Sequence, residues 1–104
     1  METKQKLFSN IPFDMIQDTF IKCLTEILLL NPDSIDVDIS DDEYICMFIL
    51  FKEKSVFFDL AFYYENDKIK KEALINIGEN KKTICSYSSY DINKVIDKLR
   101  ISIK

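Results

Sequence analysis

Residues 44–64, with the sequence YICMFILFKEKSVFFDLAFYY, form two apolar runs separated by a short polar segment. Residues 44–51 and 56–64 would be apolar on both faces of an extended chain, apart from Asp59 in the second run. The polar segment 52–54 between them is long enough for only a tight turn. Two adjoining apolar runs of this length predict a β-hairpin in the middle of a sheet.

The residues before this hairpin alternate between apolar and acidic side chains. Ile35, Val37 and Ile39 alternate with Asp36 and Asp38. A period of two predicts a half-buried strand with carboxylates on its outer face. The Ser-Asp-Asp segment that follows predicts a turn.

Two further strands are predicted after the hairpin, at residues 69–77 and 83–87, with polar turns at 65–68 and 78–81. Within the first of these strands, alternate apolar residues are able to share one face: Ile69, Ala73, Ile75 and Ile77. Gly78 is the only glycine of the chain. We expect it in the second turn, where a positive φ is least costly for glycine.

An amphipathic helix is predicted before the strands. It begins near Pro12, since proline is favoured at the first helical position, and it ends at Asn31-Pro32. Spacings of three and four residues build one apolar stripe from Phe13, Ile16, Phe20, Cys23, Leu24, Ile27 and Leu28.

A second amphipathic helix is predicted at the C-terminal end. The segment 88–91, with the sequence SSYD, has the pattern of a capping box. Ile92, Val95, Ile96 and Leu99 then recur at helical spacing. We expect this helix to pack its apolar stripe beside that of the first one.

The predicted order is therefore α-β-β-β-β-β-α, with short connections that favour an antiparallel meander. We expect one α+β domain over residues 1–104, in which about five strands carry an N-terminal and a C-terminal helix on one face. Residues 1–10 are predicted to be a frayed lead-in. Two helices on one face leave part of the apolar central hairpin uncovered. Either that surface binds a partner or a second copy, or the sheet curls strongly enough to bury it.

The composition excludes several classes of enzyme. The chain of 104 residues has no histidine and only one glycine. It therefore lacks the commonest general base, the commonest neutral metal ligand and any glycine-rich phosphate loop. Asp59 is the only carboxylate inside an apolar run. We expect a protein that is not an enzyme, with no catalytic residues, no bound metal and no cofactor.

The cysteines and the lengths of the apolar runs indicate where in the cell the protein is located. Cys23, Cys46 and Cys85 are odd in number and far apart, which favours small core residues in a reducing compartment. No run approaches the roughly 18 apolar residues of a membrane span, and no secretory signal pattern is present. We expect a cytoplasmic protein that does not bind membranes. Its excess of lysine over arginine, thirteen to one, indicates an AT-rich bacterial or phage genome.

The charge is distributed unevenly along the chain. Residues 1–52 have a net charge of −6, and residues 53–104 have a net charge of +2. The acidic residues gather in a stripe of Asp36, Asp38, Asp41, Asp42 and Glu43. The stripe does not match an EF-hand calcium loop that begins at Asp36. Asp41 stands at the position that needs glycine, and Met47 stands at the position that needs glutamate. The remaining interpretations are a solvated strand edge, a looser cation site, or a surface that mimics a nucleic-acid backbone toward a basic partner.

These observations predict a small acidic protein-binding domain rather than one that contacts nucleic acid directly. Our specific hypothesis is an inhibitor or immunity-type protein that neutralises a basic enzyme or effector, with a nuclease among the candidates, including a phage-encoded inhibitor of host defence. The acidic stripe would steer encounter, and Phe51, Phe57, Tyr63 and Tyr64 would be the apolar anchors. The alternative is a homodimeric or larger structural or chaperone-like adaptor that associates through its uncovered sheet face.

Overall fold

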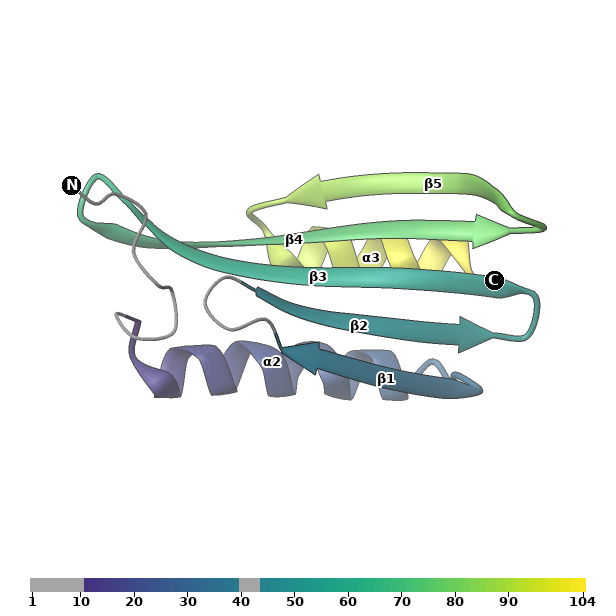
Figure 1. Ribbon diagram of the computed structural model, residues 1–104, viewed down its shortest axis with the longest axis horizontal. Helices are drawn as coiled ribbons and strands as arrows, with labels where there is room; N and C mark the ends of the chain where they lie inside the picture. Colours follow the sequence, from purple (N-terminus) through teal and green to yellow (C-terminus); the bar gives the residue numbers. More distant parts are fainter. Residues whose placement is uncertain (1–10, 40–43) are drawn as a thin grey trace.

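The computed structural model describes residues 11–39 and 44–104, and its elements follow the predicted order (Figure 1). Five antiparallel strands form one open sheet in the order β1-β2-β3-β4-β5, so the predicted meander is confirmed. The elements are α2 (Phe13–Leu28), β1 (Ser34–Ile39), β2 (Tyr44–Phe51), β3 (Lys54–Glu65), β4 (Lys68–Glu79), β5 (Lys82–Ser89) and α3 (Ile92–Ser102).

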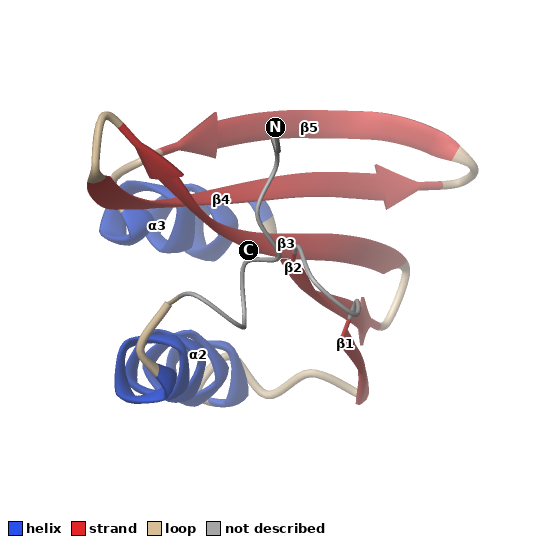
Figure 2. Cartoon of the chain, turned by 60° about the vertical axis from the view of Figure 1, so that its left-hand side comes forward, coloured by secondary structure: helices blue, strands red, loops and turns tan. Residues whose placement is uncertain are grey.

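Both helices lie on the same side of the sheet, as predicted (Figure 2). The side chains that face them form the hydrophobic core, and each is at most 3 % exposed. They are Ile45, Met47 and Ile49 of β2, Val56, Phe58, Leu60 and Phe62 of β3, and Ala73, Ile75 and Ile77 of β4. Except for Phe62, which stands opposite Lys71, these residues stand opposite one another in the strand register, so they bury one face of the central strands together.

Helix α2 begins after Pro12, where the missing proline N–H costs nothing. Its buried stripe is Ile16, Thr19, Cys23 and Ile27. The Thr19 hydroxyl accepts a hydrogen bond of 3.3 Å from Lys71 Nζ on β4, which satisfies a buried polar group.

Leu28 was expected on this stripe but is 53 % exposed, because it lies about 100° around the helix from Ile27 in the last turn. The side chain of Phe13 lies outside the described part of the structure.

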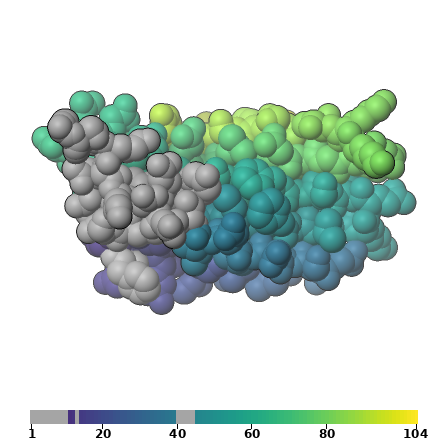
Figure 3. Space-filling view, in the orientation of Figure 1, coloured from purple at the N-terminus to yellow at the C-terminus, as the bar shows by residue number. Residues whose placement is uncertain are grey.

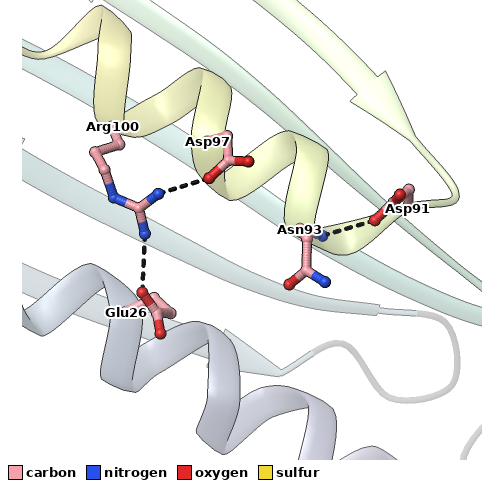
Figure 4. A network of polar contacts seen from close by, with 5 residues as sticks. All are labelled: Glu26, Asp91, Asn93, Asp97 and Arg100. Carbon is pink, nitrogen blue, oxygen red and sulfur yellow. Dashed lines mark hydrogen bonds and ion pairs between the residues drawn. The ribbon is translucent and has the colours of Figure 1, made fainter.

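Helix α3 packs Ile92, Val95, Ile96 and Leu99 against the sheet, as its periodicity predicts. The capping-box prediction is wrong, because strand β5 continues through Ser89 and Asp91 itself is the N-cap. Asp91 Oδ1 accepts a hydrogen bond of 3.1 Å from the Asn93 amide (Figure 4). The Ser89 hydroxyl in turn accepts one of 3.0 Å from the Asp91 amide.

A small charged network joins the two helices. Arg100 on α3 donates to Glu26 on α2 at 2.9 Å and to Asp97 one turn earlier at 2.6 Å (Figure 4). These groups are more than one-third exposed, so each pair stabilises the fold by about 1 kcal/mol at most. The burial of apolar side chains therefore dominates the packing of the helices.

The turn between β4 and β5 is made by Asn80 and Lys81, with φ of 55° and 65°. Two consecutive positive φ values match the twist of a hairpin, and asparagine tolerates them. Gly78 was expected in this turn but lies within β4, and its φ is not positive. A Cβ atom there would lie 3.3 Å from Ser55 Oγ and 3.4 Å from the Lys82 carbonyl oxygen, so glycine instead permits a close approach beside the register shift at Ile77/Gly78.

Strand β1 forms where its alternation predicts, but only Ile35 packs against the core. Val37 and Ile39 are 40 % and 60 % exposed, so the predicted half-burial of this strand is wrong. β1 is an edge strand with one neighbour, β2, and therefore receives less cover than the central strands.

Among the described residues, no helix is both long enough and apolar enough to cross a membrane.

Candidate functional site

The second face of the sheet carries the alternate residues of every strand, and neither helix covers it (Figures 2 and 3). We call it the uncovered face. The register aligns one cross-strand row of Asp36, Phe48, Phe57, Asn76 and Ser86, and a second row of Asp38, Cys46, Asp59, Leu74 and Ser88. Cys46 in the second row is buried, but the sheet does not curl enough to bury the whole face, since Phe48 in the first row and its neighbour Leu50 are 47 % and 50 % exposed.

Near the turn between β2 and β3, this face carries an apolar patch of Phe48, Leu50 and Phe57. The rings of Phe48 and Phe57 pack with centroids 5.2 Å apart and an interplanar angle of 50°. Beside them lies a shallow hollow of about 350 Å³, which the three side chains line together with Gly78 and Thr83. The missing side chain at Gly78 helps to leave this hollow open. An aromatic pair beside a depression is a shape that a protruding side chain of another protein fits.

Two carboxylates of the predicted acidic stripe border the apolar patch. Asp36 and Asp38 are exposed on β1, directly opposite Phe48 and Cys46 of β2. Neither forms an ion pair with another described residue. The remaining members of the stripe, Asp41, Asp42 and Glu43, lie outside the described residues.

Asp59 lies in the next row, where its carboxylate meets the thiol of Cys46. Cys46 Sγ donates to Asp59 Oδ1 at 3.5 Å. Burial raises the pKa of Cys46 to about 11, with the charge of Asp59 adding to the effect. Burial also raises the pKa of Asp59, although its hydrogen bond with Cys46 opposes that shift. The thiol is thus held in its neutral form, which is the opposite of what a cysteine nucleophile requires.

The four predicted aromatic anchors do not form one surface. Phe57 and Tyr63 lie on the uncovered face, whereas Phe51 and Tyr64 stand in register with residues of the helix side. Tyr63 is tied to Tyr90 by a hydrogen bond, and its pKa is raised above the usual value, chiefly by burial. Phe51 and Tyr64 therefore do not belong to the uncovered face, because alternate residues of a strand point to opposite faces.

Phe48 and Leu50 are surface residues that the sequence reasoning missed. For β3, the sequence did contain a signal. Asp59 is a carboxylate within an apolar run, so it indicates which alternate residues of this strand point away from the core, and Phe57 and Tyr63 are among them. Strand β2 contains no such polar marker, since residues 44–51 are all apolar. Only its pairing with β3 shows that Phe48 stands on the row of Phe57.

Among the described residues, no three Cys, Asp or Glu side chains converge in a way that could hold a metal ion. Comparison with models of known protein families, with curated proteins and with solved structures finds no match.

Proposed function

We propose that this chain is a non-catalytic protein-binding domain of the inhibitor or immunity type, which docks its uncovered face on a basic protein surface. The observation that carries the proposal is the row Asp36–Phe48–Phe57, in which the exposed Phe48 packs on the partly buried Phe57 and stands beside a carboxylate without a described ion pair. A cytoplasmic setting fits the three cysteines, which are all free thiols.

The apolar patch supplies the driving force in this proposal. Phe48 and Leu50 are each about half exposed, so a partner that covers them removes apolar surface from water. Complete burial of such a side chain is worth roughly 1.5–3 kcal/mol, and half of it is still to be gained here. Large aromatic side chains are enriched at protein interfaces and are frequent among their anchors.

The charges on the uncovered face select a basic partner. By register, its strands carry five carboxylates: Asp36, Asp38, Asp59, Glu65 and Glu72. The two lysines on this face of the described strands, Lys68 and Lys70, lie with Glu65 at the end of the β3–β4 hairpin, away from the apolar patch. A basic groove, such as the substrate site of a nuclease, would be attracted and then covered by this arrangement.

Self-association through the same face is less favoured. Two copies placed face to face would bring their carboxylates together in a chain whose net charge is already −4. Like charges held near an interface cost free energy and slow encounter. If the protein proves to be a homodimer that forms through this face, self-association replaces the proposed binding of a basic partner.

The test compares variants of the uncovered face with matched variants on the helices. Phe48→Ser is matched by Ile101→Ser, which also removes an exposed apolar side chain, on α3. The double variant Asp36→Lys with Asp38→Lys is matched by Asp14→Lys with Asp18→Lys, which changes the charge equally on exposed positions of α2. Thermal unfolding of each variant verifies that it is folded.

Each variant is used as bait in a lysate of the native host, and any protein retained by the wild type is purified for binding kinetics. We expect a basic protein that the helix variants retain and both face variants lose. Phe48→Ser should accelerate dissociation, and the aspartate variant should slow association and flatten its dependence on salt. Equal retention by all four variants, or a dimeric mass in light scattering that Phe48→Ser abolishes, would overturn the proposal.

A further inference from the structure

Most of strand β5 is a sheet edge without the usual protection against further strand pairing. In the described sheet its only strand neighbour is β4. Of its eight residues only the first, Lys82, is charged, and none is proline. The opposite edge, β1, presents the charges of Asp36 and Asp38. Natural edge strands are commonly blunted by charges, prolines or bulges, and β5 has none of these from Cys85 to Ser89, so this half of β5 remains open to another strand.

The regular part of β5 is long enough to pair with an added strand. The register shift at Ile77/Gly78 leaves Ile84 without a partner on β4, so β5 has a bulge near its start. From Cys85 to Ser89 the strand pairs with β4 in unbroken register. An extended segment could therefore continue the ladder along this half of β5 through backbone hydrogen bonds.

The two sides of this edge differ in chemistry. On the helix side, Lys98 of α3 lies over the ring of Tyr87, with its Nζ 5.9 Å from the ring centroid. Lys94 is exposed on the same flank of α3, one turn earlier. On the uncovered side stand Ser86 and Ser88, which are small and uncharged. A strand added here would point alternate side chains toward two lysines and the others toward hydroxyl groups.

We propose that the edge of β5 binds an extended segment of a partner protein by strand addition, with acidic residues at the alternate positions that face Lys94 and Lys98. Charge complementarity favours this occupant over a second copy. Antiparallel pairing of two β5 strands about a twofold axis would bring the lysine flanks of both α3 helices together. This surface lies at the edge opposite Asp36 and Asp38, so the inference is independent of the function proposed above.

The probe is a fluorescent, capped peptide of about eight residues, the length of β5, in which glutamate alternates with threonine. Binding to the full chain is measured by fluorescence anisotropy at low salt. Two further peptides carry N-methyl groups on one or the other set of alternate amides, because an added strand offers only one of its two edges to β5. A fourth peptide replaces each glutamate with lysine.

We expect the glutamate peptide to bind and the lysine peptide not to bind. Methylation of one set of amides should abolish binding, and methylation of the other set should leave it intact. Lys94→Glu with Lys98→Glu should weaken binding by about tenfold. The matched variant Lys22→Glu with Lys68→Glu changes exposed lysines elsewhere and should leave binding unchanged.

Three results would overturn the inference. The first is failure of the glutamate peptide to bind the folded chain. The second is an equal effect of the two methylation patterns or of the two lysine double variants, which would show unspecific charge attraction. The third is concentration-dependent protection of the β5 amides in hydrogen exchange without peptide, which would identify a second copy as the occupant.

Discussion

Phe48 and Phe57 stand directly opposite each other on β2 and β3, and their rings pack 5.2 Å apart on the face that neither helix covers. The pair thus combines a structural contact with an exposed surface. Cross-strand aromatic pairs stabilise a sheet beyond the area that they bury. The contact can be measured separately from any binding role.

A double-mutant cycle with Phe48→Ala and Phe57→Ala should give a coupling of about 0.5–1.5 kcal/mol in the free energy of unfolding. Urea denaturation of the wild type, both single variants and the double variant supplies the four values. The matched cycle pairs Phe48→Ala with Ile84→Ala on β5, three strand spacings or about 14 Å away. That cycle should be additive, and equal coupling in both would contradict a specific ring contact.

Asp59→Asn should stabilise the protein increasingly as the pH rises. Burial raises the pKa of Asp59 above its usual value of 3.8, so the folded chain keeps this proton to a higher pH than the unfolded chain. Ionisation therefore favours unfolding as the pH rises above about 4, and asparagine removes that cost. The difference in unfolding free energy between variant and wild type should grow between about pH 4 and pH 7. A difference that stays constant or shrinks would contradict a raised pKa.

The three thiols should differ in reactivity in the folded protein. Cys23 is fully buried, and burial raises its pKa to about 12, while Cys46 is 6 % exposed with a pKa of about 11. Cys85 is only half-buried. Iodoacetamide labelling near pH 8, followed by mass spectrometry, should therefore modify Cys85 first. Cys85→Ser should remove this fast phase, and labelling of Cys23 at the same rate in the native state would contradict the described core.

Helix α3 should show a sharp contrast between its two sides. Leu99 is fully buried against the sheet, whereas Ile101 is 67 % exposed. Leu99→Ala should lower the free energy of unfolding by about 2–5 kcal/mol, and Ile101→Ala should change it by less than about 0.5 kcal/mol. Similar losses in urea denaturation would show that α3 does not pack as described.

The elements of this fold were predictable because they depend on local patterns. Spacings of three and four in residues 13–28 and 92–99 are enough to specify amphipathic helices, and the apolar runs of β2 and β3 specify a central hairpin. The local predictions that failed concern positions set by contacts rather than by pattern. Gly78 lies where a strand passes close to Ser55, and Ser88 stays in the strand instead of capping a helix.

The amino-acid sequence by itself determined the helices, the strands, their antiparallel order and the acidic character of β1. Only the tertiary structure decided which row of the central hairpin is buried, because both rows of β2 are apolar and either would gain from burial. The register buries Met47 and leaves Phe48 exposed beside Asp36. That juxtaposition comes from strand pairing between residues distant in the sequence, which no local period can specify.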